Sequence, residues 1–204
     1  MQLVPTQDDV VALLRETGGL RGGHFEYPNG LHVAQYLQVA LTMRYYTAAK
    51  ILSVGLSRLV RANPEIRAMI PELSIVAPAT GGLPVAYGVC EALRAKQVYW
   101  GEPNGADQPM RLRQFCDVKP GEKILLVDDI MRSGQKLSQI KSLVESRGGE
   151  VVALAVVIFE PYPNPATFDP LPFYYLAKLE QPFYPDAASC ELCQQGVAVD
   201  RVWV

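Results

Sequence analysis

The stretch Ile124–Gly134, which reads ILLVDDIMRSG, decides the fold of this chain. Its first four residues are apolar on both faces and too few for a helix, which is typical of a buried parallel strand. Asp128 and Asp129 stand at the end of that strand, and an amphipathic helix is predicted over Ser133–Arg147. In open α/β sheets, ligands bind beyond the carboxyl ends of the strands. The stretch therefore predicts a parallel sheet and the edge of it that carries a site.

The same stretch indicates a ligand with two different ends. A helix N-terminus offers unpaired N–H groups and partial positive charge, which suit a phosphate. Asp128 and Asp129 would repel that phosphate, but they suit neutral hydroxyls or a metal ion. A ribose 5-phosphate has hydroxyls at one end and a phosphate at the other. The alternative is a strand that ends in solvent-exposed aspartates, with Ser133 as an ordinary helix cap.

A second loop of this kind is Ala77–Gly82, which reads APATGG and joins the apolar run Leu73–Ala77 to a predicted helix over Leu83–Leu93. Its glycines allow backbone N–H groups to approach an anion closely. A plain strand-to-helix turn is the alternative. Two such loops, one with paired carboxylates, fit a substrate that carries a phosphate and a diphosphate. Neither a P-loop motif nor a dinucleotide-binding glycine motif is present.

The remaining patterns complete an α/β fold. Thr6 and Asp9 form a capping-box pattern before a short N-terminal helix, and residues 20–30 are predicted as a loop. One or two helices are predicted over Leu31–Arg61, ending at Asn63-Pro64. Further strands are predicted at Gln97–Trp100, Val151–Phe159 and Phe173–Leu179.

Alternating strands and helices predict a parallel sheet flanked by helices on both faces. We expect a single domain, in which residues 63–180 form the α/β core. Residues 1–62 form a helical N-terminal part, and together with the C-terminal tail 181–204 they build a small hood over the sheet.

Composition excludes several classes of protein. The 204 residues are 49% hydrophobic and carry a net charge of -2, which suits a globular domain. General nucleic-acid binders usually have a basic excess, so we expect no nucleic-acid partner. No apolar run is long enough to span a membrane, and Met1–Asp9 lacks the pattern of a secretion signal. We therefore expect a cytoplasmic protein that does not associate with membranes.

The four cysteines leave two interpretations open. Cys190 and Cys193 form a C-x-x-C pair, which supplies half of the four ligands of a zinc site. His24 and His32, the other candidate ligands, lie far upstream. We therefore favour a pair of reduced thiols in a C-terminal turn over a zinc site.

These motifs together resemble the type I phosphoribosyltransferases, whose signature is four apolar residues, two acidic residues and a small-residue phosphate loop. The order of the other segments is similar to the orotate phosphoribosyltransferase family, and the resemblance extends from about Gly19 to Gly196. The segments that carry it are Gly22–Phe25, Gly30–His32 with Tyr36, Ala79–Pro84, Leu112-Arg113, Lys119–Glu122 and Cys190–Gly196.

The resemblance implies an enzyme that moves ribose 5-phosphate from phosphoribosyl pyrophosphate to a nucleobase with magnesium. Asp128 and Asp129 would hold the ribose hydroxyls, and Asp129 would also assist the metal indirectly. His24 and Phe25 are the implied base-binding residues. The implied donor-binding residues are Arg132, Ser133, Gly134, Gln135 and Lys136 for the 5-phosphate, and Thr80, Gly81 and Gly82 for the diphosphate. Arg111 and Arg113 would belong to a mobile basic arm. The implied catalytic residues are Asp128, Asp129 and Arg113.

The chain departs from the family pattern at several positions. Gln135 stands where the family has a second glycine, so a positive φ there would be strained. Lys136 replaces a hydroxyl, and we expect the charges of Arg132 and Lys136 to compensate. The basic arm has fewer cations than usual, and Pro28-Asn29 replaces a Lys-Ser or Ser-Ser pair near the base.

Three functions remain open at this stage. The first is transfer to orotate in pyrimidine nucleotide synthesis, by an enzyme expected to be a homodimer. The second is transfer to a purine or another base. The third is a sensor that binds phosphoribosyl pyrophosphate but turns it over poorly, as the altered loop and arm would allow.

Overall fold

A six-stranded sheet forms the centre of the protein in the computed structural model, which describes residues 4–105 and 108–202. Its strand order is β5-β4-β3-β6-β7-β8, and every neighbouring pair is parallel except β4 with β5. The predicted α/β class is therefore confirmed. The strands are β3 (Ser74–Pro78), β4 (Gln97–Pro103), β5 (Met110–Leu112), β6 (Lys123–Met131), β7 (Glu150–Phe159) and β8 (Phe173–Lys178).

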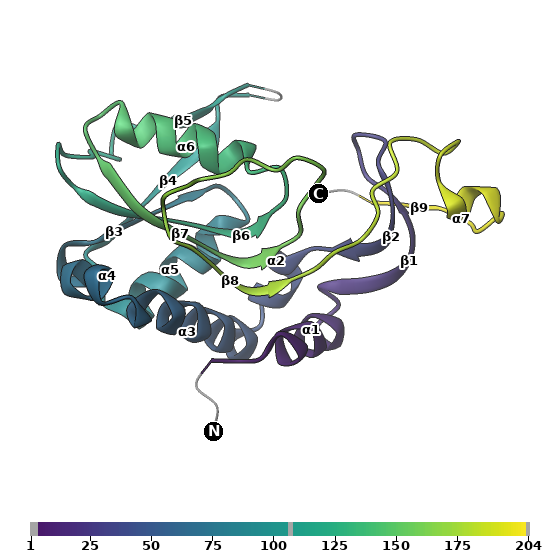
Figure 1. Cartoon of the computed structure of the whole chain (residues 1–204), viewed down its shortest axis with the longest axis horizontal. Coiled ribbons are helices and arrows are strands. Elements are labelled where there is room, and N and C mark those ends of the chain that lie inside the picture. Colours follow the sequence, from purple (N-terminus) through teal and green to yellow (C-terminus); the bar gives the residue numbers. More distant parts are fainter. Residues whose placement is uncertain (1–3, 106–107, 203–204) are drawn as a thin grey trace.

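Helices cover both faces of this sheet (Figure 1). Helix α6 (Gln135–Glu145) packs on one face through Leu137, Ile140 and Val144. The other face packs against α1 (Gln7–Glu16), α3 (Tyr46–Ala62) and α5 (Gly82–Leu93). Strand β6 has Ile124–Val127 fully buried because both its faces are covered, as its unbroken apolar run predicts. Three short helices, α2 (Val39–Met43), α4 (Pro64–Met69) and the 3-10 helix η1 (Ile70–Glu72), also precede β3 in the chain.

Two helix boundaries follow from their local sequence. Thr6 accepts a hydrogen bond from the Asp9 backbone N–H at 3.1 Å, and the Asp9 carboxylate accepts one from the Thr6 backbone N–H at 2.9 Å. This confirms the predicted capping box. Helix α3 ends at Ala62, as the Asn63-Pro64 pair predicts. Asn63 then caps α4, whose first residue is Pro64.

A separate three-stranded sheet, which we call the hood, has the order β2-β1-β9. It consists of β1 (Leu20–Glu26), β2 (His32–Leu37) and β9 (Asp200–Arg201), with the short helix α7 (Glu191–Gln194) beside it. The prediction of a loop over residues 20–30 and of a helix from Leu31 was therefore wrong in this region. The strands form because each finds a partner elsewhere in the chain, and a bulge between Gly22 and Phe25 disrupts the alternation that would have marked β1.

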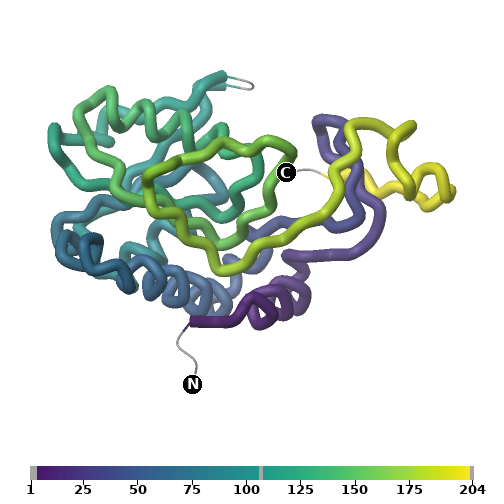
Figure 2. Tube along the Cα trace, in the orientation of Figure 1, coloured from purple at the N-terminus to yellow at the C-terminus, as the bar shows by residue number. Residues whose placement is uncertain are grey.

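The hood joins a strand from the N-terminal part of the chain to one from the C-terminal part. Strand β1 pairs in parallel with β9, and the purple and yellow parts of the trace lie side by side there (Figure 2). Its small core consists of Phe25, Tyr27, Val33, Tyr36 and Val202. Helices α1 and α3, also from the N-terminal part, lie under the large sheet instead (Figure 1). Within the described residues, no helix is long and apolar enough to cross a membrane.

Candidate functional site

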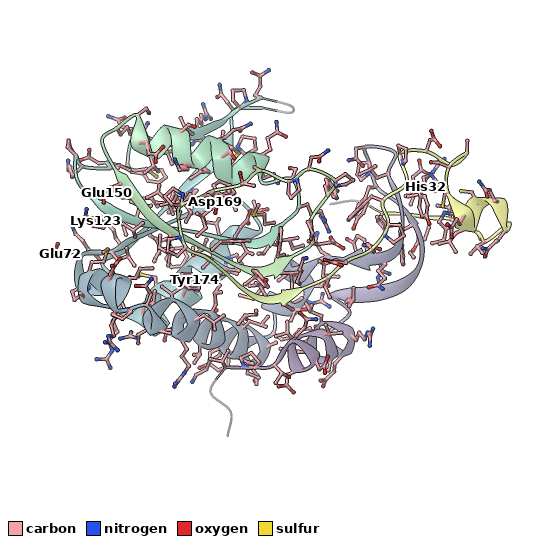
Figure 3. The ribbon with its side chains drawn as sticks, in the orientation of Figure 1. His32, Glu72, Lys123, Glu150, Asp169 and Tyr174 are labelled. Atoms are coloured by element: carbon pink, nitrogen blue, oxygen red, sulfur yellow. The ribbon has the colours of Figure 1, made fainter. Side chains whose placement is uncertain are left out.

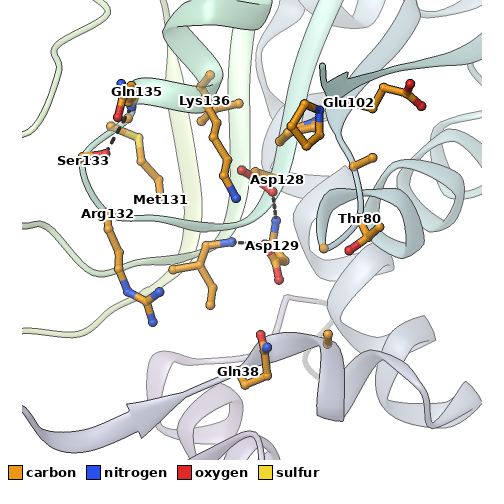
Figure 4. A pocket seen from close by; sticks show the side chains of 18 of the residues that line it. Gln38, Thr80, Glu102, Asp128, Asp129, Met131, Arg132, Ser133, Gln135 and Lys136 are labelled. Atoms are coloured by element: carbon orange, nitrogen blue, oxygen red, sulfur yellow. Dashed lines mark hydrogen bonds between the residues drawn. The ribbon is translucent and has the colours of Figure 1, made fainter. Parts of the chain in front are cut away.

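Two loops meet at the carboxyl edge of the large sheet. One follows β3 and leads into α5, and the other follows β6 and leads into α6. Because β3 and β6 are adjacent parallel strands, their ends open on the same edge. A cavity of about 630 Å³ lies between these loops (Figure 4). Its lining includes Thr80 and Gly81 from the first loop. From β6, the loop after it and the start of α6, the lining includes Asp128, Asp129, Arg132, Ser133, Gly134, Gln135 and Lys136.

Two buried carboxylates form the floor of this cavity. Asp128 is 6% exposed and Asp129 is 9% exposed. Burial and the adjacent Asp129 carboxylate raise the pKa of Asp128 well above its usual range, whereas Lys136, which extends toward Asp128 in Figure 4, opposes that shift. Such a pair favours a ligand that offers hydroxyl donors or a cation.

The two loops approach so closely that Gly81 has no room for a side chain. A Cβ at Gly81 would lie 2.7 Å from Asp129 Oδ2. At Gly82 a Cβ would lie 3.0 Å from Asp128 Oδ1. Gly81 has a φ of -60°, so the close approach and not an unusual backbone conformation requires glycine here. The peptide bond between Ala79 and Thr80 is cis.

The close approach makes Gly81→Ala a test of how the loops are spaced. We expect the added methyl group to push Asp129 aside and to lower the free energy of unfolding by about 1–3 kcal/mol, as overpacking usually does. Urea denaturation measures this change. Gly22→Ala is the matched control, because a Cβ there meets nothing within 4 Å. Equal stability of the two variants would mean that the loops move apart freely.

The loop after β6 is shaped to present backbone N–H groups at the start of α6. Gly134 has a φ of 75° and precedes the first helical residue, Gln135. The positive φ therefore falls on a glycine, and the strain expected at Gln135 does not occur. The Gln135 N–H donates to Ser133 Oγ at 3.3 Å, which turns the loop tightly. An α-helix of 11 residues begins here and directs its positive end into the cavity.

Arg132 turns its side chain away from this loop. Its Nε lies 2.5 Å from Glu160 Oε2, and its Nη2 donates to the Leu37 carbonyl at 3.1 Å and to the Tyr27 hydroxyl at 3.2 Å. Burial raises the pKa of Tyr27 to about 12, so this hydroxyl stays protonated. The expectation that the Arg132 charge compensates for the altered phosphate loop is therefore wrong, since that charge is paired with Glu160. Lys136 remains as a cation that lines the cavity.

Comparison with known proteins agrees with this arrangement of strands and loops. The model of the phosphoribosyl transferase domain family matches residues 65–167. An orotate phosphoribosyltransferase from Carboxydothermus hydrogenoformans is 34% identical over 94% of this chain and 94% of its own length. The chain belongs to the orotate phosphoribosyltransferase family.

Other members and neighbours support the family and the fold. An orotate phosphoribosyltransferase of Thermus thermophilus is 31% identical over 95% of this chain and 100% of its own. The crystal structure of the Aeropyrum pernix orotate phosphoribosyltransferase has a TM-score of 0.66 at 17% identity and covers 83% of this chain and 93% of that one. At that identity the structural likeness shows the fold alone.

The two arginines implied by the family's basic arm are held on a single carboxylate. Arg111 and Arg113 lie on and after β5, and their guanidinium groups approach Glu102 Oε1 at 3.1 Å and 2.5 Å. Although partial burial opposes the shift, hydrogen bonds from Arg113 and Arg111 lower the pKa of Glu102 below its usual value. Glu102 lines the cavity, whereas neither arginine is part of the lining.

The structure does not bring His24 and Phe25 to the cavity. His24 is 3% exposed in the hood, beside His32, and Phe25 is packed in the hood core with its ring 5.6 Å from that of Tyr36. The lining instead includes Gln38 and Tyr162, neither of which is among the predicted site residues. Both residues come from segments without a motif. Gln38 directly follows β2 and Tyr162 lies in the loop after β7, so the packing of these segments brings them to the cavity.

Proposed function

We propose that this protein transfers the ribose 5-phosphate group of phosphoribosyl pyrophosphate to orotate and releases diphosphate, a step of pyrimidine nucleotide synthesis. In this reaction the bond from the ribose C1 to diphosphate breaks, and a bond from C1 to a ring nitrogen forms. The observation that carries the proposal is the single cavity that joins two acidic residues to two anion-binding loops, in a chain of this family.

The cavity suggests where each part of the donor binds. The backbone N–H groups of residues 132–136 and the Ser133 hydroxyl would hold the 5-phosphate at the helix N-terminus. Asp128 and Asp129 would accept hydrogen bonds from the ribose hydroxyls. The loop formed by Thr80, Gly81 and Gly82 would hold the diphosphate. The positive charge that develops on the ribose in the transition state would lie close to the two carboxylates.

The oxygen-rich lining also fits magnesium. Asp128, Asp129 and Glu102 line one cavity, and Mg²⁺ is bound through a few carboxylates together with substrate phosphates. When bound, the ion would offset the negative charge of the departing diphosphate. Among the residues of this chain, Asp129 would act on it indirectly, by fixing the ribose hydroxyls.

Two structural observations favour further proposals about assembly and location. Tyr46 of α3 and Tyr87 of α5 are 78% and 56% exposed, and both helices cover the same face of the large sheet, which fits an interface between two copies in a homodimer. None of the four cysteines forms a disulfide, which fits the reducing cytoplasm.

One observation favours the sensor as a second candidate function. Glu102 engages both arginines of the arm, so fewer free cations face the diphosphate. A protein of this kind would bind phosphoribosyl pyrophosphate and turn it over slowly.

A diphosphate-release assay separates these functions. Phosphoribosyl pyrophosphate and magnesium are supplied with orotate, uracil, adenine, hypoxanthine or xanthine in parallel. Release with orotate alone is the expected result. Release only with another base would contradict orotate as the acceptor. Tight binding of phosphoribosyl pyrophosphate without release for any base would favour the sensor.

The role of the arm is tested by Arg113→Ala. If Arg113 leaves Glu102 and contacts the diphosphate as it departs, turnover falls by about tenfold, which is ~1.4 kcal/mol of activation free energy. The dissociation constant of phosphoribosyl pyrophosphate then changes less, because the contact strengthens in the transition state. Arg15→Ala, an exposed arginine of α1, is the control. An equal loss of turnover and affinity would show that Arg113 is no transition-state contact.

A further inference from the structure

Four side chains that bind metals in other proteins meet in the hood. They are His24 of β1, His32 at the start of β2, Cys190 at the N-cap of α7 and Cys193 within α7. One potential ligand atom from each lies within 4.8 Å of all the others. The two histidines and Cys190 are at most 5% exposed. Figure 3 places His32 beside α7, and none of the four residues lines the cavity between the two loops.

Four of the six distances between these atoms lie near the edge lengths of a tetrahedron around one ion, and the other two are at most 4.8 Å. His24 Nε2 lies 3.0 Å from His32 Nδ1 and 3.5 Å from each of the two sulfurs, and Cys193 Sγ lies 3.4 Å from His32 Nδ1. Tetrahedral zinc with Zn–N near 2.0–2.1 Å and Zn–S near 2.3 Å separates neighbouring ligand atoms by roughly 3.3–3.8 Å. The four atoms therefore already stand close to the required positions.

The contact between His24 and the Val197 carbonyl determines the tautomer of the His24 ring, and so which ring nitrogen has a free lone pair. His24 Nδ1 lies 2.8 Å from the Val197 carbonyl oxygen, which can only accept. Nδ1 therefore carries a proton, and in the neutral ring Nε2 presents its lone pair to His32 and the two sulfurs. A backbone carbonyl on the outer nitrogen is the usual support of a metal-bound histidine.

We propose that His24, His32, Cys190 and Cys193 bind one structural zinc ion. A mixed set of two nitrogens and two sulfurs in tetrahedral array selects zinc, whereas magnesium prefers oxygen ligands. Such a site is closed, because all four positions are taken by protein atoms, so its role is structural. This replaces our interpretation of the cysteine pair as reduced thiols in a C-terminal turn.

The position of the site explains what the ion would do. The hood has a core of five buried residues, which is small for a sheet whose strands lie at opposite ends of the chain. The cluster joins β1 and β2 to the C-terminal segment. The same hood supplies the Tyr27 hydroxyl and the Leu37 carbonyl that receive hydrogen bonds from Arg132. The ion would thus stabilise the hood, whose Tyr27 and Leu37 orient Arg132 in the loop after β6.

Metal analysis of the full chain tests this proposal. The protein is purified without a polyhistidine tag and under reducing conditions, and its metals are measured by inductively coupled plasma mass spectrometry. We expect about one zinc per chain in the wild type, and less than about a tenth of that in Cys193→Ser. Cys90→Ser is the matched control, since Cys90 lies in α5 outside the cluster, and it should keep its zinc. Zinc-free wild-type protein, or an intact mass that reports a Cys190–Cys193 disulfide, would overturn the proposal.

Cobalt substitution keeps the test valid if Cys193→Ser fails to fold. Co²⁺ replaces the zinc of the wild-type protein, and the absorption spectrum is recorded. Intense d–d bands with thiolate-to-cobalt charge transfer are expected from tetrahedral coordination by two sulfurs and two nitrogens. The weak bands of octahedral cobalt without charge transfer would contradict the site. Neither measurement depends on transferase activity.

Discussion

Replacing Arg132 with methionine is expected to lower the free energy of unfolding by about 3–5 kcal/mol, as the removal of one partner of a buried ion pair does. The Glu160 side chain is 1% exposed and would lose its counter-ion at 2.5 Å. It would keep the hydrogen bond from Gln181 Nε2 at 2.7 Å, which neutralises no charge. Urea denaturation at neutral pH measures the loss.

A surface ion pair of the same chemistry provides the control. Arg201 pairs with Glu26 at 2.9 Å, but its side chain is 79% exposed. Arg201→Met should therefore cost less than about 1 kcal/mol. Adding Glu160→Gln to Arg132→Met should recover much of the stability, because the uncompensated charge is then gone. Equal losses for the two arginine variants would mean that the Arg132–Glu160 pair is no more than a surface contact.

Replacing Asp129 with asparagine is expected to lower turnover by about 100–1,000-fold, the range found when one group that stabilises transition-state charge is removed. The substitution keeps the size of the side chain and its hydrogen bond to the Ile130 N–H, which now spans 2.9 Å. It removes the charge that would face the ribose and, indirectly, the metal. Affinity for phosphoribosyl pyrophosphate should fall as well, which calorimetric titration measures.

Asp117→Asn is the control for this prediction, because its carboxylate is 68% exposed and pairs with Lys119 outside the cavity lining. Steady-state assays of both variants with the same base and magnesium give the comparison. Unchanged rate and affinity in Asp129→Asn would remove Asp129 from the proposed site.

The sequence predicts those elements whose hydrophobic pattern is complete within the segment itself. Ile124–Val127 is buried on both faces and reads as one apolar run, and Ser133–Arg147 contains the helix observed at Gln135–Glu145. The hood could not be predicted in this way. Strand β1 follows no alternation because of its bulge, and its partner β9 is encoded at the other end of the chain. Pairing between such distant segments leaves no local pattern.

The same distinction explains the site. Asp128 and Asp129 are placed by the strand that carries them, so their position follows from the local sequence. The direction of the Arg132 side chain depends on Glu160 and on the hood, which no motif near Arg132 reveals. His24 and Cys190 of the proposed zinc site are 166 positions apart in the sequence. Local spacing therefore reveals only the Cys190–Cys193 pair, which is two of the four ligands.

The pairing of β1 with β9 has a consequence for how the chain folds as it is synthesised. The hydrogen bond between Arg201 and Glu26 joins residues 175 positions apart. At translation rates of about 5–20 residues per second, about 9–35 s pass between the synthesis of Glu26 and that of Arg201. During that time the β1–β2 hairpin has an open strand edge, to which other chains could pair. All six strands of the large sheet are synthesised before β9, whereas the hood closes only after Asp200 and Arg201 have left the exit tunnel.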